Sequence, residues 1–137
     1  MSQPILLDTC ALLWLVDAGR ISPEAEAALD GAEQSGAGIF VSPISAWEIG
    51  QLASKGRLTL RLEPRDWFRD ALAGGLSLAP MPPEILVASS YLPGGRLRDP
   101  ADRIIAATAR AYRYRLMTRD RPLLAFGDDG HVDTVAC

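Results

Sequence analysis

Short runs of apolar residues recur along the chain, separated by longer segments in which apolar residues repeat at helical spacing. The clearest runs are Ile5-Leu6-Leu7, Ile39-Phe40-Val41 and Leu116-Met117-Thr118, with Leu76-Ser77-Leu78 and the segment 131–135 as weaker ones. Runs of this length, bounded by turn residues, are typical of strands in a sheet. Strands that alternate with helices are joined by parallel crossovers, so the pattern predicts an α/β sandwich with a parallel sheet in the middle.

Helix-start signals fill the gaps between these runs. Four of them place a polar or acidic residue directly before a proline, which is favoured at the first helical position because its missing N–H is not needed there. They are Ser22-Pro23, Ser42-Pro43, Glu63-Pro64 and Asp99-Pro100. Further helices are expected after Asp8 and after the proline-rich stretch 80–83.

Composition limits what the protein can be. With 137 residues, 48% of them hydrophobic and 23% charged, the chain has the size of one globular domain, residues 1–137. It has no apolar stretch of the roughly 18 residues that a membrane-spanning helix needs, and a cytoplasmic protein is predicted. A net charge of −3 means that any contact with nucleic acid is local. Cys10 and Cys137 lack the spacing and histidine companions of a zinc site and are expected to be free thiols.

Acidic residues stand where the predicted strands end. Asp8 closes the first strand, and Asp120 comes two residues after a later one. Asp102 lies in the first turn of the helix that begins at Asp99, and Glu48 lies one turn into the helix after the second strand. In a parallel α/β sheet, ligands bind in the crevice at the carboxyl ends of the strands. The sequence therefore predicts that these carboxylates meet in one site.

Several carboxylates in one site repel one another, by about 4 kcal/mol for a pair about 4 Å apart at an effective dielectric constant of about 20. Either some of them are protonated or a divalent cation lies among them, and Mg²⁺ or Mn²⁺ suits oxygen ligands. Such a cation lowers the pKa of a water and neutralises charge on a phosphodiester under attack. The candidate chemistry is metal-dependent hydrolysis, with catalytic and metal-binding roles for Asp8, Glu48, Asp102 and Asp120.

Each acidic residue also has a structural interpretation. Asp99 and Asp120 stand where they can cap helices, and an acidic residue at the third helical position, such as Asp102, stabilises a helix start. For Asp99 the capping role is preferred, whereas for Asp102 capping and metal binding are compatible. Burying Asp8 at the end of an apolar strand is costly without a partner or a metal, so its purely structural interpretation is the weakest.

Polar and basic residues flank the acidic positions. Thr9 and Thr118 are candidates to hydrogen-bond a carboxylate or a metal-bound water, although the polarity usual at strand ends explains them as well. Four arginines near Asp102 and Asp120 are candidate contacts for RNA phosphates, and the alternative is that they form weak surface ion pairs. They are Arg98, Arg103, Arg119 and Arg121.

The aromatic residues and the single histidine are expected to be structural. Trp14, Trp47 and Trp67 fall at helical core positions, which favours packing in the core over stacking on bases. His131 has no partner at a meaningful spacing and lies in the last predicted strand, so no catalytic role is assigned to it.

Four segments carry the acidic residues in a recurring arrangement. They are residues 6–12 (LLDTCAL), residues 45–49 (SAWEI) with 55–58 (KGRL) following, residues 99–109 (DPADRIIAATA) and residues 118–120 (TRD). Each alone is a modest signal, but four in this order and at this spacing are specific. Over almost its whole length the sequence resembles the PIN-domain ribonucleases, and specifically the VapC toxins of toxin–antitoxin pairs.

This resemblance implies a PIN-like three-layer α/β/α sandwich with a central, mainly parallel sheet of four to five strands. It implies a metal site of Asp8, Glu48 and Asp102, with Asp120 as the fourth and more variable member and Asp99 as an additional acidic residue. It also implies dependence on Mg²⁺ or Mn²⁺, cleavage of RNA with tRNA as a candidate target, a homodimer, and neutralisation by a VapB-type antitoxin in a higher assembly.

Three other functions are left open. A PIN-like module that binds RNA or protein without catalysis is disfavoured by the complete acidic set. A phosphotransfer enzyme with Asp8 as nucleophile would commonly have a second aspartate two residues later, where this chain has Cys10. The sequence does not distinguish a toxin from a housekeeping RNA-processing nuclease of the same fold that has no antitoxin. Two departures from the family, Cys10 in place of serine and Arg98 in place of histidine, bear on substrate handling and not on the metal site.

Overall fold

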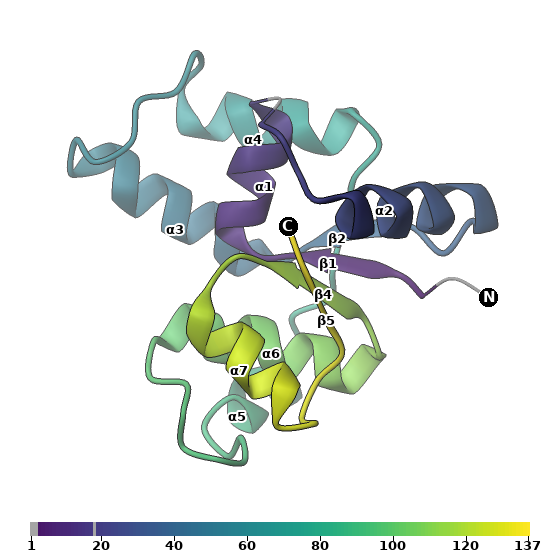
Figure 1. The fold of residues 1–137 in the computed structure, drawn as a ribbon. Helices are drawn as coiled ribbons and strands as arrows, with labels where there is room; N and C mark the ends of the chain where they lie inside the picture. Colours follow the sequence, from purple (N-terminus) through teal and green to yellow (C-terminus); the bar gives the residue numbers. More distant parts are fainter. Residues whose placement is uncertain (1–2, 18) are drawn as a thin grey trace.

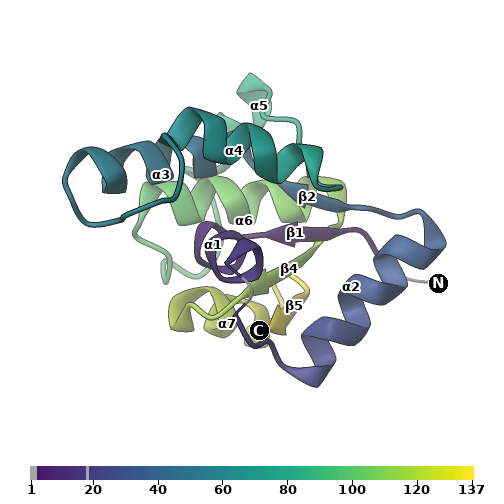
Figure 2. The same ribbon diagram turned by 90° about the horizontal axis from the view of Figure 1, so that it is seen from above.

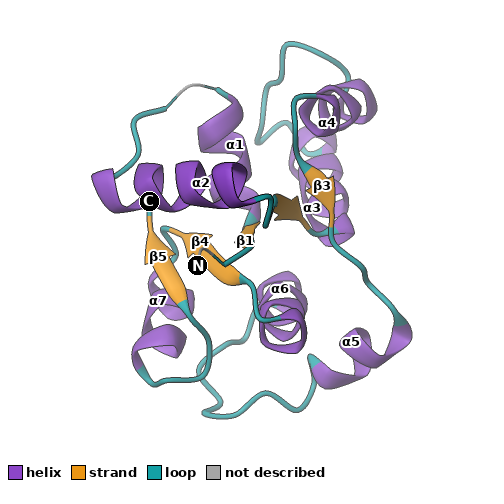
Figure 3. Cartoon of the chain, turned by 90° about the vertical axis from the view of Figure 1, so that its right-hand side faces the viewer, coloured by secondary structure: helices purple, strands orange, loops and turns teal. Residues whose placement is uncertain are grey.

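Five strands form one sheet in the computed structural model, which describes residues 3–17 and 19–137. The strand order is β3-β2-β1-β4-β5 and each neighbouring pair is parallel. Figure 3 shows the strands in orange between the helices. The strands are β1 (Ile5–Leu7), β2 (Ile39–Val41), β3 (Ser77–Leu78), β4 (Arg115–Thr118) and β5 (Thr134–Ala136). The helices of the described residues are α1 (Thr9–Val16), α2 (Pro23–Ser35), α3 (Pro43–Ser54), α4 (Pro64–Ala73), α5 (Pro83–Ala88), α6 (Pro100–Tyr112) and α7 (Arg121–Asp128).

The helices lie in two layers, one on each face of the sheet. In Figure 1, α1, α2, α3 and α4 lie above the sheet, and α5, α6 and α7 lie below it. Figure 2, seen from above, shows α1 over β1, with α2 on one side of it and α3 and α4 on the other. The prediction of a three-layer α/β/α sandwich around a parallel sheet is confirmed.

The central strand β1 is buried on both faces. Ile5 and Leu7 belong to the apolar cluster beneath α1 and α2, whereas Leu6 belongs to the opposite cluster, with Ile105 and Ala106 of α6. Alternate residues of a strand point to opposite faces, so a strand between two helical layers needs an uninterrupted apolar run. Asp8, the polar residue that follows this run, therefore lies at the border of the core.

Side-chain caps fix where the helices begin. The Ser22 hydroxyl accepts the N–H of Ala25 at 3.0 Å, and the Ser42 hydroxyl accepts the N–H of Ile44 at 3.1 Å. Both serines precede a proline, as the sequence predicts. At its other end α2 stops at Gly36, whose φ of 76° is a left-handed conformation that glycine adopts without strain.

The sheet edges are shorter than the apolar pattern predicts. β3 consists of two exposed residues, and β5 begins at Thr134 and not at His131. The His131 ring packs instead against Phe126, with 4.9 Å between the ring centroids. Both edge strands therefore begin later than the apolar runs predict, and such short edge strands leave few unpaired backbone groups for another chain to pair with.

Two sequence predictions concern the protein's surroundings. Cys10 and Cys137 are free thiols, as predicted. Among the described residues, no helix combines the length and the apolar character needed to cross a lipid bilayer. The cytoplasmic location stays a prediction.

Candidate active site

The carboxyl ends of the neighbouring strands β1 and β4 lie side by side, on the left of Figure 1, and helices begin beside them. This end of the sheet, where the strands finish, is the acidic edge. α1 follows β1 after one residue, and α7 follows β4 after two. α6 also begins near this edge. The negative charges of Asp8 and Asp120 are close enough to raise the pKa of Asp102 in its first turn. The carboxylates that the sequence predicts to meet are thus brought to one edge.

Asp8 is buried at this edge, with 3% of its surface exposed. Its Oδ1 accepts the backbone N–H of Ala11 at 2.7 Å, which caps α1, and its Oδ2 accepts the hydroxyl of Thr118 from the end of β4. The Thr118 oxygen in turn accepts the N–H of Asp120 at 2.9 Å. One buried hydroxyl therefore links the acidic positions that follow two neighbouring strands.

Two further carboxylates cap helices at the same edge. Asp99 Oδ1 accepts the N–H of Asp102 at 3.0 Å at the start of α6, and Asp120 Oδ2 accepts the N–H of Leu123 at 3.0 Å at the start of α7. Both predicted capping roles are confirmed. A helix N-terminus carries a partial positive charge of about half an elementary charge, so the starts of α1, α6 and α7 offset part of the repulsion among the carboxylates.

Glu48 is oriented by two hydroxyl groups. Thr9 donates a hydrogen bond from Oγ1 to Glu48 Oε1, and its oxygen lies 2.8 Å from Ser45 Oγ. The single Thr9 proton goes to Glu48, so Ser45 is the donor to Thr9. Ser45 is fully buried and was not singled out from the sequence. Its place three residues before Glu48, on the same side of the helix, is the signal that would have found it.

Burial and mutual repulsion raise the pKa of three carboxyl groups. Loss of hydration is the largest cause for Asp8, Glu48 and Asp102 alike. The pKa of Asp102 rises to about 7, because the negative charges of its neighbours, first among them Asp120, add to burial. The same two causes raise the pKa of the Cys10 thiol to about 11, so this cysteine stays protonated and is a poor nucleophile at neutral pH.

The donor atoms fit a hard divalent cation. They are carboxylate oxygens, and the Asp102 carboxyl accepts no hydrogen bond from the described residues. In residues 3–17 and 19–137, no group of three or more Asp, Glu, His or Cys side chains is arranged to hold one ion together. Mg²⁺ is commonly bound through one or two carboxylates, with waters and substrate phosphates completing its shell. The residues therefore fit Mg²⁺ or Mn²⁺ in an open site and not in a closed protein cage.

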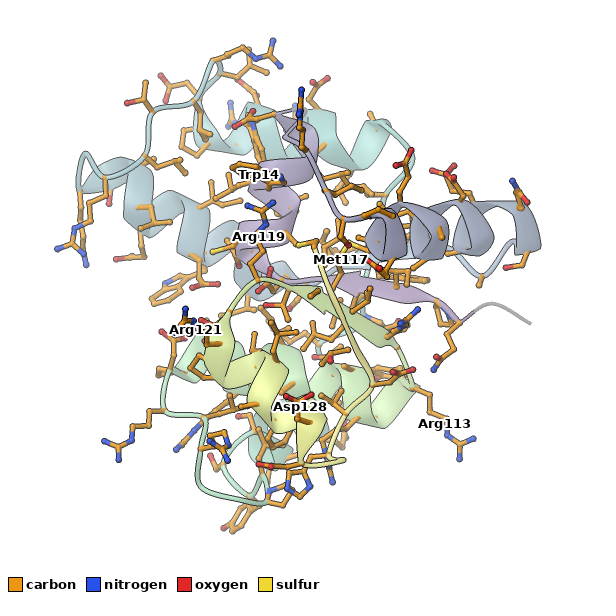
Figure 4. All side chains as sticks on the ribbon, viewed as in Figure 1. Trp14, Arg113, Met117, Arg119, Arg121 and Asp128 are labelled. Atoms are coloured by element: carbon orange, nitrogen blue, oxygen red, sulfur yellow. The ribbon has the colours of Figure 1, made fainter. Side chains whose placement is uncertain are left out.

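The four candidate arginines fall into two pairs. Arg103 donates from Nε to the carbonyl of Leu97 at 2.7 Å, and Arg119 donates to the carbonyls of Arg20 and Cys137. These two hold the fold together around the site. Arg98 and Arg121 are exposed, and neither forms a hydrogen bond or an ion pair within the described residues. Figure 4 shows Arg121 at the start of α7.

The packing prediction is wrong for Trp47, which is 58% exposed, and right for Trp67, which is 2% exposed. On α3 the buried residues are Ser45 and Ile49. Trp47 lies two residues from each, about 200° around the helix, so it points away from the core. Trp14 is only partly covered, with the Arg119 guanidinium 3.9 Å from its ring centroid (Figure 4).

Comparison with known proteins identifies the family. Residues 5–127 match the family model of the PIN domain. Ribonuclease VapC22 of Mycobacterium tuberculosis is 32% identical over 120 residues, which are 87% of this chain and 88% of that protein.

Solved structures of similar fold agree. VapBC2 from Rickettsia felis, solved bound to a DNA fragment from their promoter, matches with a TM-score of 0.68 at 16% identity, over 98% of each chain. A toxin–antitoxin complex from Klebsiella pneumoniae matches with a TM-score of 0.61 at 25% identity, over 96% of this chain and 95% of that chain. The first likeness speaks for the fold alone, and the domain match and the sequence relative decide the family. The chain belongs to the PIN-domain family, in the branch of the VapC proteins.

Proposed function

We propose that this chain is a metal-dependent endoribonuclease and the toxin of a toxin–antitoxin pair. The observation that carries the proposal is that hydroxyl groups at the carboxyl ends of β1 and β4 link Asp8 to the segment of Asp120 and hold Glu48 at the start of α1. Its similarity to a VapC protein that is named a ribonuclease supports it. The residues to which we assign the chemistry are Asp8, Glu48, Asp102 and Asp120.

Hydroxyl groups and a helix start orient the proposed ligands. Thr118 and the first turn of α1 engage both oxygens of Asp8, and each oxygen keeps a further lone pair for a cation. The Ser45–Thr9 pair turns Glu48 toward the same edge. Groups whose geometry is fixed before the ligand arrives need little reorganisation when it binds.

The least restrained ligand is Asp102, whose carboxyl accepts no hydrogen bond from the described residues. When Mg²⁺ or Mn²⁺ is bound, it supplies a Lewis acid that polarises the phosphodiester and lowers the pKa of the attacking water.

To Arg98 and Arg121 we assign contacts with backbone phosphates, because both guanidinium groups are exposed at the starts of α6 and α7. These contacts act locally, in accordance with the acidic net charge of the chain.

The proposal includes a homodimer and a VapB-type antitoxin that neutralises the toxin. Two solved structures of similar fold are a VapBC protein and a toxin–antitoxin complex by name, which supports such a partner. Exposed large apolar side chains on β3 and α5, at Leu78, Leu86 and Val87, offer a surface that a second copy would cover.

A phosphotransfer role for Asp8 is the alternative that the geometry disfavours most. Both of its oxygens already accept hydrogen bonds, and 3% exposure leaves little room for a phosphoryl group to approach in line. A housekeeping nuclease of the same fold stays an alternative, and a short gene directly upstream of this one would favour the toxin.

The first experiment is cleavage of a labelled total-RNA or tRNA pool by the purified protein. We expect discrete fragments with Mg²⁺ or Mn²⁺ and intact RNA with EDTA, because the acidic site needs a cation to approach phosphate. Cleavage that continues unchanged in EDTA would contradict metal dependence, and no cleavage under any condition would favour the inactive binding module.

Asp99→Asn is expected to leave the fold as stable as the wild type and to cost less activity than Asp102→Asn. Asparagine caps helices about as well as aspartate, so the bond to the Asp102 N–H is kept. Asp99→Ala, which loses this cap, should cost about 1 kcal/mol of unfolding free energy. Urea unfolding and RNA cleavage rates, measured on the three variants together, check both statements. Equal loss of activity in Asp99→Asn and Asp102→Asn would make Asp99 a full member of the metal site.

A further inference from the structure

Trp47 is the most exposed of the three tryptophans. It is 58% exposed on α3, and within the described residues it forms no aromatic pair and no cation–π contact. Trp67 is buried in the core. The guanidinium of Arg119 lies over the Trp14 ring, as the labelled pair in Figure 4 shows, and the Trp14 Nε1 donates to the carbonyl of Arg20. Of the three, Trp47 is the one whose ring is neither buried in the core nor stacked by another described side chain.

The exposed ring of Trp47 lies next to the candidate active site. Trp47 directly precedes Glu48, whose carboxylate accepts the Thr9 hydroxyl at the start of α1 and lies close enough to Asp99 for that charge to act on it. Consecutive helical residues point about 100° apart. The ring and the carboxylate therefore occupy adjoining sides of the same helical turn.

Small side chains leave the surface beside the ring clear. Ala46 is exposed next to Trp47, and Gly50 lies three residues further on the same side of α3. A Cβ added at Gly50 would meet no atom within 4 Å, so the helix surface is open at this position. A flat ligand can thus lie on the indole without displacing protein atoms.

We infer that Trp47 is a stacking platform for one nucleobase of the RNA strand, beside the phosphate that is cleaved. The inference rests on the proposed ribonuclease function and adds a base contact to it. Single-stranded RNA is commonly held by unstacked bases laid on aromatic side chains, and such stacking accepts any base because each has a π face. The carboxylate-bound cation and guanidinium groups such as Arg121, at the start of α7 (Figure 4), then contact the phosphates on either side of this base.

A second copy of the chain is a less suitable cover for the ring. Charged residues are depleted from the cores of protein interfaces because their hydration is lost there. A protein packed on Trp47 would also dehydrate Glu48 and the exposed Asp99. An RNA strand brings phosphate and its cation to the same carboxylates, which compensates their charge. Other exposed apolar side chains, Leu78 and Val87, lie on β3 and α5 and not on α3.

The test compares two single-stranded probes in EDTA, a short oligoadenylate and an abasic ribose-phosphate chain of the same length. Both carry the same charge, so the repulsion between phosphates and the metal-free carboxylates weakens the binding of both equally, and only the first can stack. We expect the wild type to bind oligoadenylate roughly 5-fold to 150-fold more tightly, the range that stacking of one base produces, with quenching of tryptophan fluorescence. Because binding in EDTA needs no cleavage, failure of this inference and failure of the ribonuclease proposal are read in separate assays.

Variants assign the effect to the ring. Trp47→Ala is expected to bind both probes with the affinity that the wild type has for the abasic chain. Trp47→Phe should keep most of the preference for oligoadenylate without the fluorescence change. Trp14→Phe is the matched control, since it alters the other partly exposed tryptophan, and it should keep both the preference and the quenching.

Three results would overturn the inference. They are equal binding of the two probes by the wild type, an unchanged preference in Trp47→Ala, and conversion of Trp47→Ala from a dimer to a monomer in sedimentation velocity, which would make the ring a subunit contact. Circular dichroism verifies that the variant is folded, and Trp47→Gln replaces it in the same comparison if it is not.

Discussion

Asp8→Asn is expected to lose at least about 10³-fold of the RNA cleavage rate while the protein stays folded. The substitution removes one negative charge from the proposed ligand set and keeps the shape of the side chain. It therefore weakens binding of the cation without opening a cavity in a residue that is 3% exposed. The measurement is the initial rate of cleavage of a labelled tRNA pool with Mg²⁺, at equal concentrations of wild type and variant.

Asparagine keeps one hydrogen bond of Asp8 and reverses the other, so the buried Thr118 hydroxyl proton loses its acceptor. Its amide oxygen accepts the N–H of Ala11, and its amide nitrogen donates to Thr118 Oγ1, whose hydroxyl rotates to point elsewhere. Burial raises the pKa of Asp8, so the folded chain holds its negative charge less readily than the unfolded chain does. Loss of the Thr118 acceptor and removal of a buried charge act in opposite directions, so the thermal midpoint of Asp8→Asn is expected to lie within a few degrees of the wild-type value.

Two controls separate the charge of Asp8 from its structural role. Asp8→Ala should also lose cleavage, but it removes the cap of α1 and leaves Thr118 without its acceptor, at a cost of about 1–3 kcal/mol. Asp70→Asn, exposed on α4, should change neither cleavage nor stability. If Asp8→Asn unfolds, or cleaves RNA as fast as the wild type, Asp8 is not a ligand of the proposed metal site.

The elements and the acidic edge are predictable because their signals are local. An apolar run buried on both faces, as in β1, and a capping residue before proline, as at Asp99-Pro100, depend on neighbours within a few residues. Asp8, Asp99 and Asp120 each cap a helix at the exit of a strand or at the same edge. The capping and ligand roles that the sequence presents as alternatives are therefore compatible in the fold.

The contacts around that edge are not predictable, because they join distant segments. The sequence predicts Arg103 and Arg119 as phosphate contacts, a prediction that stays untested, and it does not predict that their guanidinium groups bind backbone carbonyls. The Ser45–Thr9 contact spans 36 residues, so the spacing of Ser45 from Glu48 on α3 identifies the serine but not its partner. For Trp47, helical spacing identifies a stripe of apolar residues, but the register of α3 against its neighbours decides which of them reach the core.

Without metal, the protein is expected to lose stability as the pH rises. The pKa of Asp102 is about 7 in the fold against an ordinary 3.8, so between these values the folded chain holds a proton that the unfolded chain has released. Stability falls with pH wherever the folded state binds more protons. The contribution is fully present below 3.8 and is lost as the pH passes through about 7. The raised pKa values of Asp8 and Glu48 act in the same direction.

Thermal unfolding in EDTA, followed by circular dichroism between about pH 5 and about pH 8, measures this loss. Asp102→Asn should show a flatter pH profile and a higher midpoint than the wild type at the alkaline end, whereas Asp70→Asn should follow the wild type. Mg²⁺ added at the alkaline end should raise the wild-type midpoint, because a ligand of the folded state stabilises it, and should change Asp102→Asn little. Parallel profiles of wild type and Asp102→Asn would contradict the raised pKa, and an equal response of both to Mg²⁺ would exclude Asp102 as a ligand. Since the charge that destabilises the metal-free fold is the charge proposed to bind the cation, one substitution should remove both effects together.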